Sequence, residues 1–124
     1  MMDGYINVLK PPGMSSGAVV AIVKRAAREK AGHAGTLDPE AAGVLPVMVG
    51  RATRLFDFLV EKQKTYLAEI AFGAATDTQD AQGTVIETGG SIPGFAAVQA
   101  VLPQFIGTVM QRPPIYSALK QGGQ

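Results

Sequence analysis

Prolines and glycines divide this chain into short segments, and this limits its possible folds more than any other feature. The 124 residues include eight prolines and fifteen glycines. Proline cannot continue a helix or a central strand, and glycine weakens the interior of either element. Between these breaks, strand-like and helix-like patterns are intermingled without a regular strand–helix–strand period. We therefore expect an α+β fold with a mixed, largely antiparallel sheet and flanking helices.

The spacing of apolar residues predicts the individual elements. Alternating or β-branched residues indicate strands, whereas apolar residues at helical spacing indicate helices. Ser15 or Ser16 can cap the first helix, and Gly32 suits its C-terminal end. The expected strands are Tyr5–Leu9, Gly43–Gly50, Lys64–Gly73, 84–88 and 107–111, and residues 112–120 begin another extended segment. The expected helices are 16–31, 51–62 and 95–105, with Pro103 weakening the last one.

The composition is that of an ordinary globular protein, with 47% hydrophobic and 17% charged residues. No apolar run approaches the roughly 18 residues that a membrane-spanning helix needs, and the first ten residues do not resemble a secretory signal. The absence of cysteine excludes disulfides and thiolate metal sites. These features favour a cytoplasmic protein with no membrane partner.

Charge is distributed unevenly along the chain. Residues 1–64 contain nine Lys or Arg and six Asp or Glu, whereas residues 65–124 contain two and four. A basic half is compatible with a surface that faces phosphates. The alternative is that these cations only solvate helix faces.

The segment Gly32–Pro46 is the best candidate for chemistry. Pro39 restricts the backbone of Asp38, so the carboxylate is aimed by a stiff dipeptide, and nearby glycines leave room for a ligand. Such a carboxylate can be a nucleophile, a general base or an electrostatic stabiliser. The alternative is an Asp-Pro turn in which the side chain accepts local N–H groups.

Two further residues have open interpretations. His33, the single histidine, can contact a substrate or serve the structure, and Tyr66 can belong to the core or present an aromatic platform to a base. One histidine without cysteines or spaced acids does not make a metal site. The acidic stretch 77–80 lacks the glycine and the closing glutamate of a calcium loop.

Four motifs occur in order: GYINVLKPPGMSS, GHAGTLDPEAAGVLPVMVGRATRL, KTYLAEIAFGAATDTQDAQG and QRPPIYSALKQGG. Together they closely resemble the bacterial tRNA pseudouridine synthase B family, over nearly the whole chain. The resemblance implies the pseudouridine synthase catalytic-domain fold. It also implies isomerisation of a flipped-out uridine in the T-arm loop of tRNA, without metal or organic cofactor.

The resemblance also assigns roles to individual side chains. Asp38 matches the catalytic aspartate, Tyr66 a tyrosine that packs on the target base, and His33 a histidine that helps to hold the extruded nucleotides. Which bond the aspartate attacks, or whether it starts glycal formation by taking a proton, stays open.

Three other positions are matched by the same resemblance. Asp80 corresponds to a position near the bound RNA, Lys10 to a lysine in a motif that supports the catalytic loop, and Tyr116 to a strand beside the cleft. The family's arginine partner of the catalytic aspartate has no match here. Gly17-Ala18 stands where relatives often have polar residues.

Family members are more than twice as long as this chain. Residues 1–124 are therefore expected to be the N-terminal portion of a catalytic domain, without its remainder and without the C-terminal RNA-binding module. A partial sheet leaves open edges, so we expect self-association or pairing with a complementary segment. The alternative function is a catalytically silent RNA-binding fragment.

Overall fold

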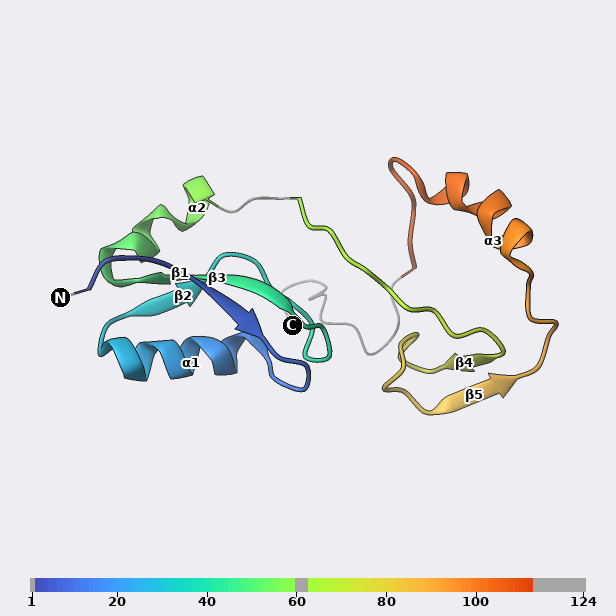
Figure 1. The fold of residues 1–124 in the computed structure, drawn as a ribbon, viewed down its shortest axis with the longest axis horizontal. Helices are drawn as coiled ribbons and strands as arrows, with labels where there is room; N and C mark the ends of the chain where they lie inside the picture. Colours follow the sequence, from blue (N-terminus) through green and yellow to red (C-terminus); the bar gives the residue numbers. More distant parts are fainter. Residues whose placement is uncertain (1, 60–62, 113–124) are drawn as a thin grey trace. The chain divides into compact units, whose positions relative to one another are not determined.

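The computed structural model describes residues 2–59 and 63–112, which fall into two compact units. The first unit comprises Met1–Tyr66 and the second Leu67–Gln124. Figure 1 shows the elements of each unit.

The first unit is built on a three-stranded antiparallel sheet. Its strands are β1 (Gly4–Lys10), β2 (Ala31–His33) and β3 (Gly43–Val49), in the order β1-β3-β2. Every residue of β1 pairs with one of β3, from Gly4 with Val49 to Lys10 with Gly43. The two strands expected from β-branched residues are confirmed, and so is the α+β fold with antiparallel pairing.

Helix α1 (Ser16–Ala27) lies along one face of this sheet (Figure 1). Its Val19 is buried against Leu45 and Val47 of β3, and Val8 of β1 packs on the same cluster. Burying these β-branched and leucine side chains is the main stabilising contribution to the unit. The opposite face of the sheet carries the exposed side chains of Leu9 and Val44.

The start of α1 agrees with the sequence prediction, whereas its end does not. The Ser15 side chain caps the start by accepting the Ala18 amide at 3.1 Å. The expected end near Gly32 is wrong, because Arg28 adopts the left-handed conformation and ends the helix four residues earlier. The early stop releases residues 31–33, which form β2, a strand that the sequence did not predict.

Pro46 lies inside the central strand without breaking the long ladder. Its carbonyl oxygen accepts the Ala34 amide at 3.0 Å, so this residue's hydrogen-bonding side faces β2. Its missing N–H therefore also faces β2, whose pairing with β3 covers only Val47–Val49. Proline is tolerated because the pairing with β1 does not need its N–H.

The expected helix over 51–62 is only partly correct. A 3-10 helix, η1 (Gly50–Leu55), precedes a short α2 (Phe56–Leu59), and residues 60–62 lie outside the described part. Gly50 has a φ of +61°, and a Cβ there would overlap the Asp3 carboxylate and the Met2 carbonyl oxygen. The chain therefore needs glycine at the point where β3 turns into η1.

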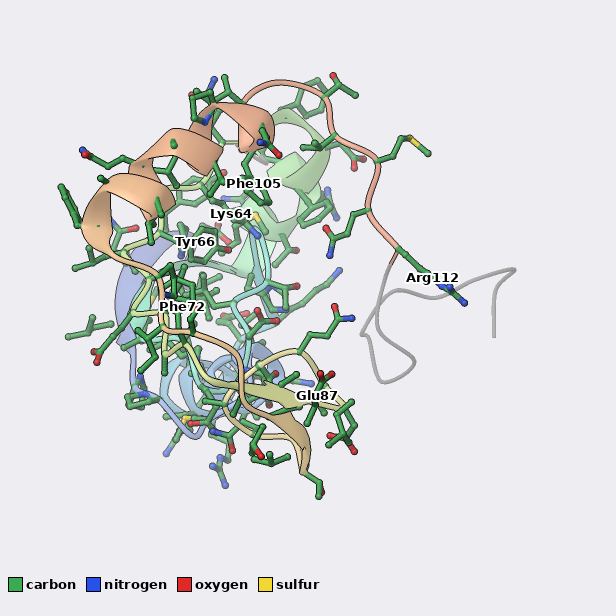
Figure 2. The ribbon with its side chains drawn as sticks, turned by 90° about the vertical axis from the view of Figure 1, so that its right-hand side faces the viewer. Lys64, Tyr66, Phe72, Glu87, Phe105 and Arg112 are labelled. Carbon is green, nitrogen blue, oxygen red and sulfur yellow. The ribbon has the colours of Figure 1, made fainter. Side chains whose placement is uncertain are left out.

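The second unit has secondary structure but no buried residue among residues 67–112. A two-stranded ribbon is formed by β4 (Ala74–Thr76) and β5 (Val85–Thr88), and α3 (Phe95–Val101) continues into the 3-10 helix η2 (Leu102–Phe105). The expected strand at 84–88 and the helix weakened at Pro103 are thus confirmed in outline. Phe72 and Phe105, labelled in Figure 2, are both exposed.

Two predicted strands are wrong. Lys64–Gly73 and 107–111 have no ladder in the structure, and β4 instead begins at Ala74. The alternation of Tyr66, Ala68, Ile70 and Phe72 suits a strand, but a strand also needs a neighbour. Among the described residues this segment has one such backbone contact, at its end, where the Gly73 carbonyl oxygen accepts the Gly89 amide at 3.1 Å. The extended segment expected at 112–120 lies outside them except for Arg112.

No helix in the described ranges is long and apolar enough to cross a bilayer.

Candidate functional site

The loop that carries Asp38, residues 34–42, is fixed from both sides of that residue. On the near side, the Ser16 hydroxyl accepts the Leu37 amide and donates to the Leu37 carbonyl oxygen, both at 3.0 Å. Ser16 is only 3% exposed, so water does not compete strongly for these bonds. One buried hydroxyl therefore sets both backbone groups of the residue that precedes Asp38.

On the far side, Lys10 and Gly13 hold Pro39. The Lys10 ammonium is fully buried and donates to the carbonyl oxygens of Pro11, Met14 and Pro39, at 2.9, 2.6 and 2.8 Å. The Gly13 amide donates to the same Pro39 oxygen at 2.8 Å. Lysine has three N–H donors, so this carbonyl cage uses all of them. The end of β1 and the start of α1 thus become one support for the loop.

The Asp38 carboxylate itself is exposed, and no described residue donates to it or pairs with it. The hydrogen bond of the local turn runs from the Ala41 amide to the backbone oxygen of Asp38, at 3.0 Å. The turn interpretation, in which the side chain accepts local N–H groups, is therefore not what the described residues form. A rigid backbone here presents a carboxylate whose oxygens are available.

His33 ends β2 just before this loop. Its Nδ1 lies 2.7 Å from the Gly35 carbonyl oxygen, which can only accept, so Nδ1 carries the proton in this contact. The ring is half-buried, and Nε2 has no protein partner among the described residues. The contact orients the imidazole and leaves one nitrogen for a ligand.

Lys64 connects the Tyr66 segment to the loop. Its ammonium donates to the Thr36 carbonyl oxygen at 2.8 Å, and its Cε would lie 3.3 Å from a Cβ at Gly35. Gly35 has a φ of +97°, so glycine is favoured there for conformation as well as for space. Figure 2 shows Lys64 and Tyr66 as sticks. The Tyr66 side chain, two residues along, is 58% exposed, so the core interpretation of this tyrosine does not hold in the structure.

Asp80 lies in the second unit, in the turn between β4 and β5. Its carboxylate accepts the Thr78 hydroxyl at 2.6 Å and the Gln82 amide at 2.8 Å. The Thr78 hydroxyl, followed by the Gln82 amide, holds the pKa of the Asp80 carboxyl below its ordinary value. In the structure this side chain organises its own turn, and its role near RNA stays a prediction.

The structure thus brings Lys10, His33 and Asp38 together in the first unit, with Tyr66 at the end of the segment that Lys64 attaches. Tyr116 lies outside the described residues. Sequence reasoning missed Ser16 and Lys64. Their side chains bind backbone groups 21 and 28 positions away, respectively, and such contacts leave no periodic signal.

No group of three or more His, Cys, Asp or Glu side chains suited to a metal ion occurs in the described ranges. The cations near the loop, Lys10 and Lys64, bind carbonyl oxygens. Asp38, His33 and Tyr66 together offer a carboxylate, an imidazole nitrogen and an exposed phenol.

Comparisons with known proteins agree on one family. The family model "TruB family pseudouridylate synthase (N terminal domain)" matches residues 23–124. The chain is 51% identical, over 99% of its length, to tRNA pseudouridine synthase B of Caldanaerobacter subterraneus subsp. tengcongensis, and 54% identical over 99% to that of Symbiobacterium thermophilum. It covers 44% and 42% of these relatives, which is less than half of their length.

A solved structure supports the same fold. The match to "Crystal Structure of a Cbf5-Nop10-Gar1 Complex" has a TM-score of 0.61 and 35% identity, and covers 94% of this chain and 31% of that one.

Proposed function

Because this chain belongs to the TruB family of pseudouridylate synthases, we propose that it contributes the aspartate-bearing part of an enzyme that converts uridine to pseudouridine in RNA. The observation that carries the proposal is the Asp38 carboxylate, which is exposed and without a protein partner among the described residues, on a loop pinned at Leu37 and Pro39. A carboxylate that only stabilised a turn would be bonded to that turn.

The chemistry needs few protein groups. The bond between N1 of uracil and C1′ of the ribose breaks, the base turns, and C5 bonds to C1′ while C5 loses its proton and N1 regains one. No electrons are exchanged with a partner and no group is gained or lost, so the reaction requires no redox cofactor. One carboxylate starts it, by attacking the sugar or the base or by taking a proton, and a base removes the C5 proton.

Each side chain of the site has a place in this scheme. Asp38 acts on the nucleotide, and Tyr66 stacks on the uracil. Stacking returns about 1–3 kcal/mol per base, against the few kcal/mol that extruding a nucleotide costs. His33 offers Nε2 to an extruded neighbour, whereas Lys10 and Ser16 hold the loop without touching the substrate.

The proposed substrate is the T-arm stem-loop of tRNA, and this rests on the names of the relatives. Unstacked loop bases are the usual targets of specific RNA recognition. Asp80, Tyr116, self-association and pairing with a complementary segment stay predictions within this proposal.

A chimera tests the function while supplying the length that the relatives have. Residues 1–124 replace the matched region of the Symbiobacterium thermophilum relative, and tritium release is measured from tRNA labelled at uracil C5. We expect activity close to that of the intact relative. Asp38→Asn should lower it by about a thousandfold or more, whereas Asp57→Asn, an exposed acid on α2, should leave it unchanged.

Two results would contradict the proposal: activity that survives Asp38→Asn, or an inactive chimera that melts at the temperature of the active relative. The silent alternative makes a separate prediction for the 124-residue chain alone. That chain would bind the stem-loop with an affinity that falls as the salt concentration rises, and it would release no tritium from labelled RNA.

A further inference from the structure

Four cations gather at the C-terminal end of α1, at the opposite end of the sheet from Asp38. They line an open concavity of about 790 Å³, formed by Ala21, Lys24, Arg25, Arg28, Glu29 and Lys30. All four cationic side chains are exposed. We call this surface the helix-end concavity.

The cations converge for reasons visible in the backbone. Ala21, Lys24, Arg25 and Arg28 are spaced three, four and seven residues apart, so they share one face of the helix and its end. The left-handed turn at Arg28 then reverses the chain. The Lys30 carbonyl oxygen accepts the Gly50 amide at 2.7 Å, which fixes Lys30 beside the end of β3.

Arg28 is the informative residue of this group. Its φ of +54° lies in the region that favours glycine, and glycine is the usual residue at such a helix end. An arginine there imposes strain and keeps a cation that glycine would remove. Strain retained at a charged concavity points to a use for the side chain.

Other cations of the first unit have a different environment. Lys10 is buried in its carbonyl cage, Arg51 pairs with Asp3 at 2.7 Å, and Lys64 binds Thr36. Arg54 is exposed but stands on η1, and it does not line the concavity. The helix-end cations are therefore a distinct group, and a multivalent anion is the partner that their charge fits.

We propose that the helix-end concavity binds backbone phosphates in the paired stem of the RNA. This inference rests on the proposed function, because it takes the RNA whose uridine meets Asp38 as the ligand. β3 spans seven residues between the two ends of the sheet, which is about 20 Å at strand spacing. When the extruded nucleotide lies at Asp38, any contact with the concavity must come from another part of the same RNA. The paired stem is the part with the highest density of phosphates.

The test measures binding of fluorescent RNA to the 124-residue chain by anisotropy across a salt series. The probes are a T-arm stem-loop, its stem as a loop-free duplex, and its loop as a single strand. Lys24→Gln combined with Arg28→Gln should weaken stem-loop and duplex binding about tenfold at low salt. It should also lower the salt slope by about one for each lost phosphate contact. The single strand should bind as before.

The matched control removes the same charge elsewhere. Arg54→Gln combined with Arg112→Gln takes two exposed arginines and should change duplex affinity less than threefold. Equal losses in the two double variants would overturn the site, because general charge would then explain binding. Unchanged duplex binding after Lys24→Gln with Arg28→Gln would do the same.

Arg28→Gly separates binding from stability. If Arg28 only complements the helix dipole, Arg28→Gly should lower the melting temperature and leave duplex binding unchanged. Our proposal expects an equal or higher melting temperature together with weaker duplex binding. Lys24→Gln, which changes no strained backbone, should weaken duplex binding as well.

These outcomes do not depend on catalysis. An inactive chimera with salt-dependent stem binding at the concavity would leave this inference standing and remove the proposed function. Normal tritium release by the chimera, combined with unaltered duplex binding by the concavity variants, would support the proposed function and overturn this inference.

Discussion

The two units of this chain are built from similar elements but differ in what those elements enclose. In the first unit, Val19, Leu45 and Val47 are at most 3% exposed and are covered by α1 on one side and the strands on the other. In the second unit, Leu67, Ile106 and Met110 are at least 80% exposed, and no residue from 67 to 112 is buried. The residue pattern of the second unit is therefore compatible with a two-stranded ribbon and a helix. Burying their apolar side chains requires a further element that packs against them.

The comparison also places the chemistry. The backbone on either side of Asp38, at Leu37 and Pro39, is held by hydrogen bonds with Ser16 and Lys10, two buried residues of the first unit. Asp80 is held only by its own turn, through Thr78 and Gln82. The acid whose surrounding backbone is held by buried residues is therefore the one in the unit that has a hydrophobic core.

The strongest test of this contrast compares two leucines. Leu45→Ala should lower the free energy of unfolding by about 2–5 kcal/mol, because it opens a cavity in a site that is 1% exposed. Leu67→Ala, at a fully exposed position, should change it by less than about 0.5 kcal/mol. Urea denaturation followed by circular dichroism measures both. A large effect at Leu67 would mean that the second unit is covered in solution.

Substitutions at the neighbouring residues Ser15 and Ser16 should have a smaller effect on stability, but they separate support of the fold from support of the Asp38 loop. Ser15→Ala removes a helix cap and Ser16→Ala removes the bonds to Leu37, and each should cost about 1 kcal/mol. In the chimera, only Ser16→Ala should lower kcat, by about 10–100-fold, because it releases the backbone beside Asp38. KM should change little in either variant. Equal kcat values in both would show that Ser16 supports the fold alone.

Acid should produce the smallest effect, at the Asp3–Arg51 pair. Hydrogen bonds from the Arg51 backbone amide and side chain hold the pKa of Asp3 below its ordinary value. Its stabilising contribution is therefore fully present above the ordinary aspartate pKa, and is lost as pH falls through the lowered one. Asp3→Asn should lower the free energy of unfolding at neutral pH. The difference between this variant and the native chain should shrink as the solution is acidified.

The control for this titration is in the other unit. The pKa of Asp80 is also lowered, yet Asp80→Asn should leave the cooperative urea transition unchanged, since no core depends on that turn. A difference between native chain and Asp3→Asn that stays constant from neutral to acid pH would contradict the role given to the pair. High salt should shrink the effect because the pair is exposed.

The sequence predicted the elements whose signals are local. The strands around Val8 and Val47, the start of α1 at Ser15 and the exceptional character of the Asp38 loop all follow from residue type and spacing. The end of α1 did not, because Arg28 takes a conformation for which Gly32 looked better suited. β2 was missed as a consequence of that error.

Contacts between distant segments were beyond such reasoning. Alternation around Tyr66 specifies a face but no partner strand, and none pairs with it among the described residues. The hydroxyl of Ser16 and the ammonium of Lys64 act on backbone atoms of the Asp38 loop, and any residue type can supply a carbonyl oxygen. Family resemblance located Asp38, whereas only the fold indicates what holds it still.

Pro46 has a consequence for this loop. Without a hydrogen on its nitrogen, β3 offers no donor at the position where β2 would need one to grow. The antiparallel ladder therefore loses one of the two hydrogen bonds that Ala34 and Pro46 would otherwise share, which disfavours continuing β2 through Gly35 and Thr36. A proline nitrogen without a hydrogen thus favours a loop over a strand for the segment that carries Asp38.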